Sequence, residues 1–541
     1  MLWHNQLVSD SICKIEKLHV GSCKNLMKIF PPNMLRRLQN LEELKIEDCN
    51  SVEEVFEVRG ENVDEICDKG STQLRHLTLI NLLKLKHVWT SDPEAILTFQ
   101  NLRRVEVSKC KTLKSLFLVS VAKSLGHLES LRINDCGLME EIVALEEGLE
   151  TKTKFVFPRI TSLTLQSLPK LKCFYPRKHT SEWPSLKSLT IRRCNKVKIV
   201  ALNELSFSNE LSFPNTNGLG HHVLVQQPLF LIEKDTFPNL KSLELDWYDT
   251  KNQTNGRLFG EFFCKLEVLR LYGKDDKLIA FSSVFVKGLR YLKSLSFSNL
   301  FFDNKGQYAG MFERLTHSFL YKIPKLMLLW KENSEQGKAL KNLENLSVSE
   351  CGRLKNLVPS SMHFRNLNTL RVRKCHGLIS LATSSTVKSL VQLKELNLLG
   401  CKRMREIVTN EGEGESGDEI GFNQLKRLYL YDLPSLRSFH LGNRTIKFPS
   451  LENLCVIGCP EMKIFYNGVL SMPKLKRVGL DEIEWLSNQR DLLPEEDANS
   501  AIKRFWEENY DPCVQQLFTE KTDASTSEAG EKIGVDNLRM T

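Results

Sequence analysis

The sequence predicts an α/β solenoid, a stack of about 17 to 18 short coils whose strands form a parallel, concave sheet. Three observations support this prediction. A frame LxxLxLxx(C/L) recurs along most of the chain, an apolar residue usually stands three positions before each frame, and a block of four frames occurs twice. Because a fixed repeat decides the fold, it outweighs the several ordinary domains that 541 residues would suggest.

The frame sets the number and size of the coils. Most steps between frames are 23 to 28 residues, three are 32 or 33, and one is 54. A period in the twenties with alternating leucines is typical of leucine-rich repeats, in which a short strand is followed by a return segment. Stacked coils bury a core that one coil cannot, so we expect a horseshoe with an irregular or short-helical convex side. The frames start at Ile15, Leu41, Leu74, Leu102, Leu128, Ile160, Leu186, Leu240, Leu266, Leu292, Leu315, Leu343, Leu367, Leu393, Leu425, Leu451 and Leu475.

The residue three positions before the frame should also be core. It is usually large and apolar, and in "FPRI", "WPSL", "FPNL", "FPSL" and "MPKL" a proline follows it, where a fixed φ and a missing N–H suit a strand entrance. These residues are Phe99, Phe157, Trp183, Phe237, Phe263, Phe364, Phe422, Phe448 and Met472.

A longer rhythm indicates an internal duplication. The frames at 102, 128, 160 and 186 recur at 367, 393, 425 and 451 with identical steps of 26, 32 and 26 residues. "SLFLVSVAKSLGHLESLRINDC" thus aligns with "SLATSSTVKSLVQLKELNLLGC" without a gap. A duplicated block of several coils is the simplest explanation.

The ends of the array differ. Only about a dozen residues precede the first frame, which predicts that the array continues upstream or packs on another domain, since terminal coils need caps. At the other end two amphipathic helices, broken at Pro512, are expected to cover the last coil with Ile502, Phe505, Trp506, Val514, Leu517 and Phe518. The expected segments are a lead-in (1–11), a first block of repeats (12–196), an irregular coil or insertion (197–236), a second block (237–486), capping helices (487–520) and a disordered tail (521–541).

Nine frames end in cysteine, which raises the question of a metal site or disulfides. Six other frames carry Leu or Ile at that position, and neither can bind a metal or form a disulfide. We therefore interpret the cysteine as a buried apolar group. Disulfides between neighbouring coils stay geometrically conceivable, whereas zinc would need four convergent ligands. The cysteines are Cys23, Cys49, Cys110, Cys136, Cys194, Cys351, Cys375, Cys401 and Cys459.

The rest of the sequence contains no recognisable motif of a catalytic, cofactor-binding or metal-binding site. No phosphate loop, GxGxxG, HExxH or GxSxG motif occurs, and His221 and His222 lack partners in sequence, so we expect no catalytic, cofactor or metal site. A net charge of +9 is too small to indicate nucleic acid. No apolar run is long enough to span a membrane, and the start does not read as a secretory signal, so a cytoplasmic protein with free thiols is predicted.

Function should then reside on the surface. Frame positions 3, 5, 7 and 8 are expected to face solvent on the sheet, and aromatic or arginine side chains there are the types that dominate protein interfaces. Acidic segments at 53–70, 140–154 and 405–420 should project as loops, either solvated or facing the basic rungs. The candidate partner-binding residues are Arg192, Arg193, Trp247, Arg270, Tyr272, Phe319, Tyr321, Arg371, Arg373, Lys374, Tyr429 and Tyr431.

The coils "NLENLSVSECGRLKNLV", "QLKELNLLGCKRMREIV", "FPSLENLCVIGCPEMKIF" and "LYDLPSLRSF" resemble the C-terminal leucine-rich repeats of plant coiled-coil nucleotide-binding (NB-ARC) disease-resistance proteins. The resemblance covers about residues 12 to 520. It implies a non-enzymatic module that recognises a pathogen effector or a guarded host protein, or restrains the receptor's switch domain. The phosphate-binding loop of that family is missing, so nucleotide switching is not implied here.

A second function uses the same fold. Substrate receptors or adaptors of ubiquitin ligases also carry cysteine-ended repeats of about this length. This alternative stays open from the residues, although no F-box-like segment precedes Ile15 and no regular motif follows the cysteines.

Overall fold

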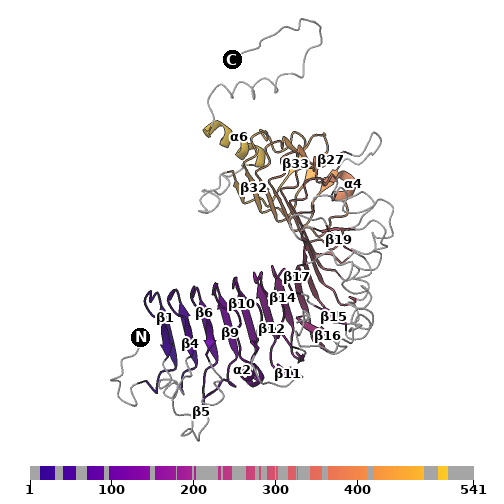
Figure 1. Ribbon diagram of the computed structural model, residues 1–541. Helices are drawn as coiled ribbons and strands as arrows, with labels where there is room; N and C mark the ends of the chain where they lie inside the picture. Colours follow the sequence, from indigo (N-terminus) through magenta and orange to yellow (C-terminus); the bar gives the residue numbers. More distant parts are fainter. Residues whose placement is uncertain are drawn as a thin grey trace, which may run out of the picture. The chain divides into compact units, whose positions relative to one another are not determined.

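The computed structural model describes residues 12–30, 40–56, 70–90, 97–145, 153–177, 179–197, 200–202, 229–232, 236–246, 263–273, 279–281, 289–298, 300–302, 315–323, 326, 342–355, 357, 364–410, 419–480 and 497–509. The chain forms two compact units, Met1–Lys325 with Glu335–Leu343 and Leu326–Ser334 with Glu344–Thr541. In both, strands stack in parallel along the chain (Figure 1).

The first unit carries one long strand for each of the first eleven frames. Each strand pairs in parallel with the strand of the next frame, in chain order. β14 pairs directly with β17, so the 54-residue step adds no strand to this sheet between them. The strands are β1 (Lys17–Gly21), β3 (Glu43–Glu47), β6 (His76–Ile80), β9 (Arg104–Ser108), β10 (Ser130–Asn134), β12 (Ser162–Gln166), β14 (Ser188–Arg192), β17 (Ser242–Asp246), β18 (Val268–Tyr272), β20 (Ser294–Ser298) and β22 (His317–Tyr321).

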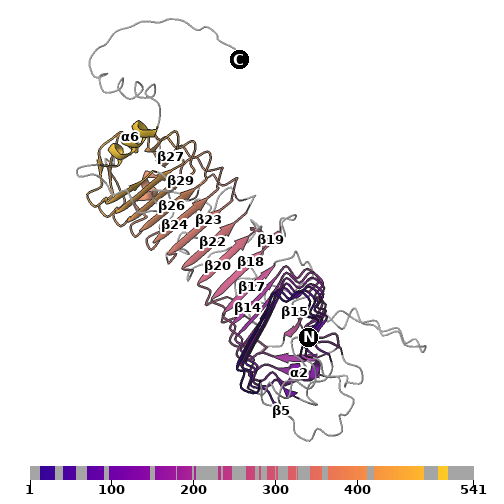
Figure 2. The same ribbon diagram turned by 90° about the vertical axis from the view of Figure 1, so that its left-hand side faces the viewer.

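The second unit repeats this arrangement for the remaining six frames. Its strands also pair in parallel and in chain order (Figure 2). They are β23 (Asn345–Ser349), β24 (Thr369–Arg373), β26 (Glu395–Leu399), β29 (Arg427–Tyr431), β32 (Asn453–Ile457) and β34 (Arg477–Gly479). The leucine-rich-repeat solenoid predicted from the frames is therefore confirmed.

The strands form because the apolar residues alternate. In β10, Leu131 and Ile133 are buried, whereas Ser130, Arg132 and Asn134 face outward. Successive side chains of a strand point to opposite faces, so the frame's leucines fill one side of the sheet. The register places identical frame positions opposite each other, as for Leu131 and Leu163. The core is thus a ladder of aliphatic side chains, one rung per coil.

Over the described residues, the return side of the coils contains short parallel strands as well as two short helices, α2 (Val119–Ser124) and α4 (Ser384–Val387). The prediction named only irregular or short-helical segments there. In the first unit the short strands are β2 (Lys28–Phe30), β4 (Glu54–Phe56), β5 (Gly70–Ser71), β7 (His87–Trp89), β8 (Leu97–Thr98), β11 (Thr153–Val156), β13 (His179–Glu182), β15 (Val200–Leu202), β16 (Phe230–Ile232), β19 (Ile279–Phe281) and β21 (Leu300–Phe302). In the second unit they are β25 (Ala382–Thr383), β27 (Glu406–Thr409), β28 (Glu419–Gly421), β30 (Ser438–His440), β31 (Thr445–Lys447) and β33 (Leu470–Ser471).

Large aromatic residues before the frames form stacks through the core. Phe157 lies 4.5 Å from Trp183 between ring centroids, and Phe422 lies 5.4 Å from Phe448, both pairs stacked. Their burial confirms that the large aromatic residue three positions before a frame belongs to the core. Met472, before the last frame, is only partly buried.

The duplicated block is visible in the structure. β9 and β24 begin 265 residues apart at Arg104 and Thr369, and the same offset relates β10 to β26, β12 to β29, and β14 to β32. Helix α2 and helix α4 also begin 265 residues apart, at Val119 and Ser384. The gapless alignment thus reflects two blocks with the same local architecture.

A sharp turn follows the long strands, and here one expectation is wrong. Frame position 8 was expected on the sheet face, but Arg193 and Lys374 follow their strands with φ of 55° and 50°. This left-handed turn directs the next residue, a Cys, Leu or Ile, into the core, and it costs about 1–2 kcal/mol for a residue with a Cβ. Gly400 and Gly458 occupy the same position at φ of 66°.

The helix α6 (Ala498–Asn509) lies after the last frame, within the segment that was predicted to contain capping helices. Ala498, Ala501 and Ile502 are buried at the spacing of one helical face. The side chains of Phe505 and Trp506 and the expected second helix, with Val514, Leu517 and Phe518, lie outside the described residues.

Candidate protein-interaction surface

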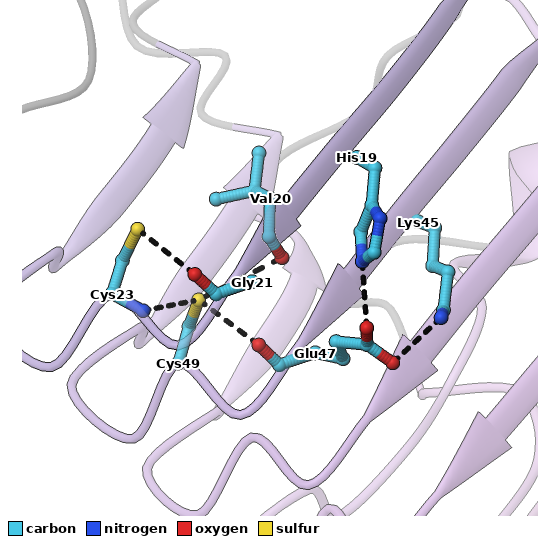
Figure 3. A network of polar contacts seen from close by, with 7 residues as sticks. All are labelled: His19, Val20, Gly21, Cys23, Lys45, Glu47 and Cys49. Carbon is cyan, nitrogen blue, oxygen red and sulfur yellow. Dashed lines mark hydrogen bonds and ion pairs between the residues drawn. The ribbon is translucent and has the colours of Figure 1, made fainter.

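The recurring cysteine is part of the core in eight of the nine frames, and Cys23 is partly exposed. Figure 3 shows Cys23 and Cys49 on neighbouring coils: the Cys49 thiol lies 3.3 Å from the Glu47 carbonyl oxygen and 3.8 Å from that of Val20. Cys110, Cys194, Cys375 and Cys459 repeat this pattern of one carbonyl on their own coil and one on the preceding coil. The thiol is therefore a weak donor to strand-end carbonyls.

Burial also makes three of these thiols poor nucleophiles. It raises the pKa of Cys194, Cys401 and Cys459 to about 12. A thiolate is the reactive form, and a buried thiol with a raised pKa rarely populates it. Within the described ranges, no group of three or more His, Cys, Asp and Glu is placed to hold a metal ion.

The sheet face, meaning the outward side chains at frame positions 3, 5 and 7, is the remaining candidate surface. In the first unit it contains a closed ion-pair network around Arg192. Its Nε donates to Asp246 at 2.9 Å, and its Nη1 donates to Glu244 at 3.1 Å. The guanidinium carbon lies 3.1 Å from the ring centroid of Tyr272, a cation–π contact.

This network limits what Arg192 can offer a partner. Only 19% of its side chain is exposed, and both carboxylates that neutralise it belong to β17. The backbone N–H of Arg193 donates to the other oxygen of Asp246, so this carboxylate also supports the turn after β14. Burial raises the pKa of Tyr272.

Other candidates of the first unit are more accessible. Arg270 lies on β18 and is partly exposed. Phe319 and Tyr321 on β22 are 39% and 38% exposed, with the Lys322 ammonium 5.3 Å from the Tyr321 ring centroid. Trp247 lies outside the described residues.

In the second unit the face centres on Glu395 of β26. Its Oε1 pairs with Arg371 of β24 at 2.7 Å, and its Oε2 pairs with Arg427 of β29 at 2.9 Å. Burial opposes ionisation of Glu395, but the two guanidinium groups outweigh it and lower its pKa. Two arginines therefore share one carboxylate, which leaves one net positive charge in this trio.

Apolar side chains lie beside this trio. Tyr431 of β29 stands between Leu399 of β26 and Ile457 of β32 in one cross-strand row. All three are partly exposed, as is Tyr429 two residues earlier on β29. Burial raises the pKa of Tyr429. Cys455, opposite Tyr429, lies on the face but is only 3% exposed.

The structure thus brings together Arg371, Arg373, Tyr429 and Tyr431 on one face, and it places Lys374 at the adjoining turn. Sequence reasoning missed Glu395, Leu399, Arg427 and Ile457. They stand at frame positions 3 and 7, so the frame itself carried the signal. An isolated carboxylate or aliphatic residue simply did not stand out among the outward positions.

Residues 1–137, 126–206, 235–364 and 361–482 match the family described as "Plant disease resistance protein RPS2-like, leucine-rich repeats". The chain belongs to this family. The resemblance noted from the coils, to the leucine-rich repeats of plant NB-ARC disease-resistance proteins, is thereby confirmed.

Individual relatives are similar over parts of the chain. The probable disease resistance proteins At5g47260 and At1g61300 of Arabidopsis thaliana are 30% and 27% identical over 131 and 176 residues. These stretches cover 23% and 31% of this chain but only 13% and 22% of the relatives' own length. The matches therefore span well under half the length of these relatives.

Among solved structures, the leucine-rich-repeat protein LIC12759 of Leptospira interrogans is 14% identical and has a TM-score of 0.35, covering 87% of this chain and 97% of that one. Over the residues that the structure describes, no helix is both long and apolar enough to cross a membrane.

Proposed function

We propose that this chain is a non-enzymatic protein-recognition module of plant innate immunity, which acts in the cytoplasm by pathogen sensing or by autoregulation of a receptor. Its partners would be a pathogen effector, a guarded host protein or a receptor switch domain. Membership of the disease-resistance repeat family supports the setting. That this chain contributes to the activity of a whole disease-resistance protein is part of the same proposal.

One observation carries the proposal: the two duplicated blocks keep the same elements but differ on the sheet face. Where the first block has Thr164 and Gln166, the second has Tyr429 and Tyr431 on a strand with the same alternation of buried and outward residues. The fold therefore does not require the tyrosines. Tyrosine and arginine are enriched among the residues that dominate binding energy at protein interfaces.

Proximity labelling in plant cells with the full chain tests this function. The comparison variant replaces Arg371, Arg373, Tyr429 and Tyr431 with alanine, and the matched control replaces Arg132, an exposed face residue of the first unit. Proteins labelled by the wild type and the control but not by the quadruple variant support the proposal. An identical set of labelled proteins for all three would overturn it.

Comparing healthy with infected tissue separates the two forms of the function. Partners found only on infection indicate pathogen sensing, whereas partners found in both tissues indicate autoregulation or a guarded host protein. Over the described residues, no observation favours the ubiquitin-ligase alternative.

A further inference from the structure

We propose that the sheet face over β24, β26, β29 and β32 binds an acidic protein segment that presents carboxylates beside an aromatic or aliphatic side chain. We refer to Arg371, Arg373, Leu399, Tyr429, Tyr431 and Ile457 as the β24–β32 patch. The inference rests on the proposed function, because it names the chemistry of the partner that this face would recognise.

The apolar half of the patch is continuous. Leu399, Tyr431 and Ile457 are direct neighbours across three parallel strands, and Tyr429 adjoins them on the same face of β29. Strands about 4.8 Å apart place such side chains in contact distance of one another. An aliphatic or aromatic side chain of a partner could therefore cover several of them at once and remove their remaining exposed surface from water.

The cationic half lies on the neighbouring strand. Arg371 and Arg373 point to the same face of β24, and Lys374 follows at the turn. Arg373 and Lys374 form no ion pair with any residue in the described part of the chain. Glu395 is already shared by Arg371 and Arg427, so the trio cannot neutralise itself. Carboxylates of a partner would neutralise the positive charge that remains.

The duplication shows that this pattern is not a requirement of the fold. At the equivalent positions the first block carries Glu106 for Arg371, Ser108 for Arg373 and Asn134 for Leu399. Because Glu106 stands where the second block has Arg371, the first block would repel the same acidic partner. A recognition surface that arose in one copy explains why the two faces differ while their strands coincide.

Planar arginines beside an apolar row favour an acidic peptide over nucleic acid. Nucleic-acid surfaces depend on many phosphate contacts from clustered lysines and arginines, whereas beyond its two arginines this patch supplies leucine, tyrosine and isoleucine. Arginine forks match carboxylate geometry, and the adjoining apolar row adds the burial that a charged peptide alone would lack.

The test is a selection of random short peptides, displayed on phage, against the full-length chain at low salt. We expect enriched peptides to combine Asp or Glu with Phe, Tyr, Trp, Leu or Ile. A synthetic copy of the strongest peptide and a copy with every Asp and Glu changed to Asn and Gln are then titrated by calorimetry. The amide copy should bind about tenfold more weakly or worse, and raising the salt should narrow this difference.

Two sets of variants test the patch, and the first set takes its three residues from the first block. Leu399→Asn, Tyr429→Thr and Tyr431→Gln together should weaken binding at least about 30-fold, the loss expected when an interface anchor of about 2 kcal/mol is removed. Arg371→Gln with Arg373→Ser should weaken it about tenfold at low salt. Thr164→Ala with Gln166→Ala, at the equivalent place in the first block, should leave affinity unchanged.

Correct folding is checked by circular dichroism and urea unfolding, which should be unchanged because the first block tolerates Asn, Thr and Gln in the same frame. Enrichment of basic or purely apolar peptides, no enrichment at all, or equal binding by the triple variant would each overturn the proposal. Face-dependent partners in the proximity experiment, combined with any of these results, would leave the recognition function standing and reject only the acidic partner.

Discussion

Replacing Arg192 with alanine should destabilise the first unit, because this side chain holds three others. The change removes two charge-assisted hydrogen bonds, of 2.9 Å to Asp246 and 3.1 Å to Glu244, and the stacking on Tyr272. Such bonds contribute about 1.5–3 kcal/mol each, and a cation–π contact adds about 0.5–2 kcal/mol.

Solvent reduces this sum. The side chains of Arg192, Glu244 and Asp246 are 19%, 22% and 16% exposed, so water partly screens the pairs and partly solvates the carboxylates left behind. We therefore expect a loss of about 2–4 kcal/mol in the free energy of unfolding, between the values typical of exposed and of fully buried pairs.

Urea unfolding measures the loss, and hydrogen exchange assigns it to β14 and β17, since a repeat array can open in parts. The matched control is Arg132→Ala, an exposed arginine on β10, with an expected effect below about 0.5 kcal/mol. A double-mutant cycle with Asp246→Ala should give a coupling of about 1–2 kcal/mol. If Arg192→Ala behaved like the control, the network would only offset its own desolvation, and our reasoning would be wrong.

Three further predictions concern the core and the turns. Gly458→Ala should lower the free energy of unfolding, measured in urea, by about 1–2 kcal/mol, because φ is 66° and a Cβ would lie 3.3 Å from the Asp432 backbone. Gly352→Ala is the control and should not lower it, because a Cβ there meets nothing within 4 Å. Burial lowers the pKa of His179 from 6.5, so the unfolded state binds the proton more tightly than the folded state. The free energy of unfolding should therefore fall as the pH drops below that value. His179→Leu should remove this part of the pH dependence of the urea midpoint. Cys110→Ala should cost about 1–2 kcal/mol, and a chelator that lowered the melting temperature would contradict the structural role of the thiol.

The turn after each strand shows where sequence reasoning was incomplete. The frame marks Arg193 and Lys374 only as residues between a strand and a buried cysteine, and a sequence of outward positions suggests that they extend the face. Their left-handed φ follows from a packing demand, since the next side chain must enter the core. Gly400 and Gly458 at that position were a signal of the turn that the leucine pattern obscured.

The sequence by itself determined the coils, their register and the identity of the core. Periodic burial of leucines is a local property, and strands of neighbouring frames pair directly, so the spacing from Leu102 to Leu186 and again from Leu367 to Leu451 sufficed to place two equivalent blocks. The exchange of cysteine with leucine likewise identified the thiols as core, which the burial of eight of the nine bears out.

Only the tertiary structure decided which outward residues already have partners. Arg192 and Asp246 are 54 residues apart in sequence but lie on adjacent strands, where their charges meet. Glu395 similarly joins Arg371 and Arg427 from the strands on either side of its own. Pairing between side chains depends on rotamers and distances across the sheet, which no frame encodes, so a face that looks uniform in sequence separates into a self-paired region around Arg192 and the β24–β32 patch.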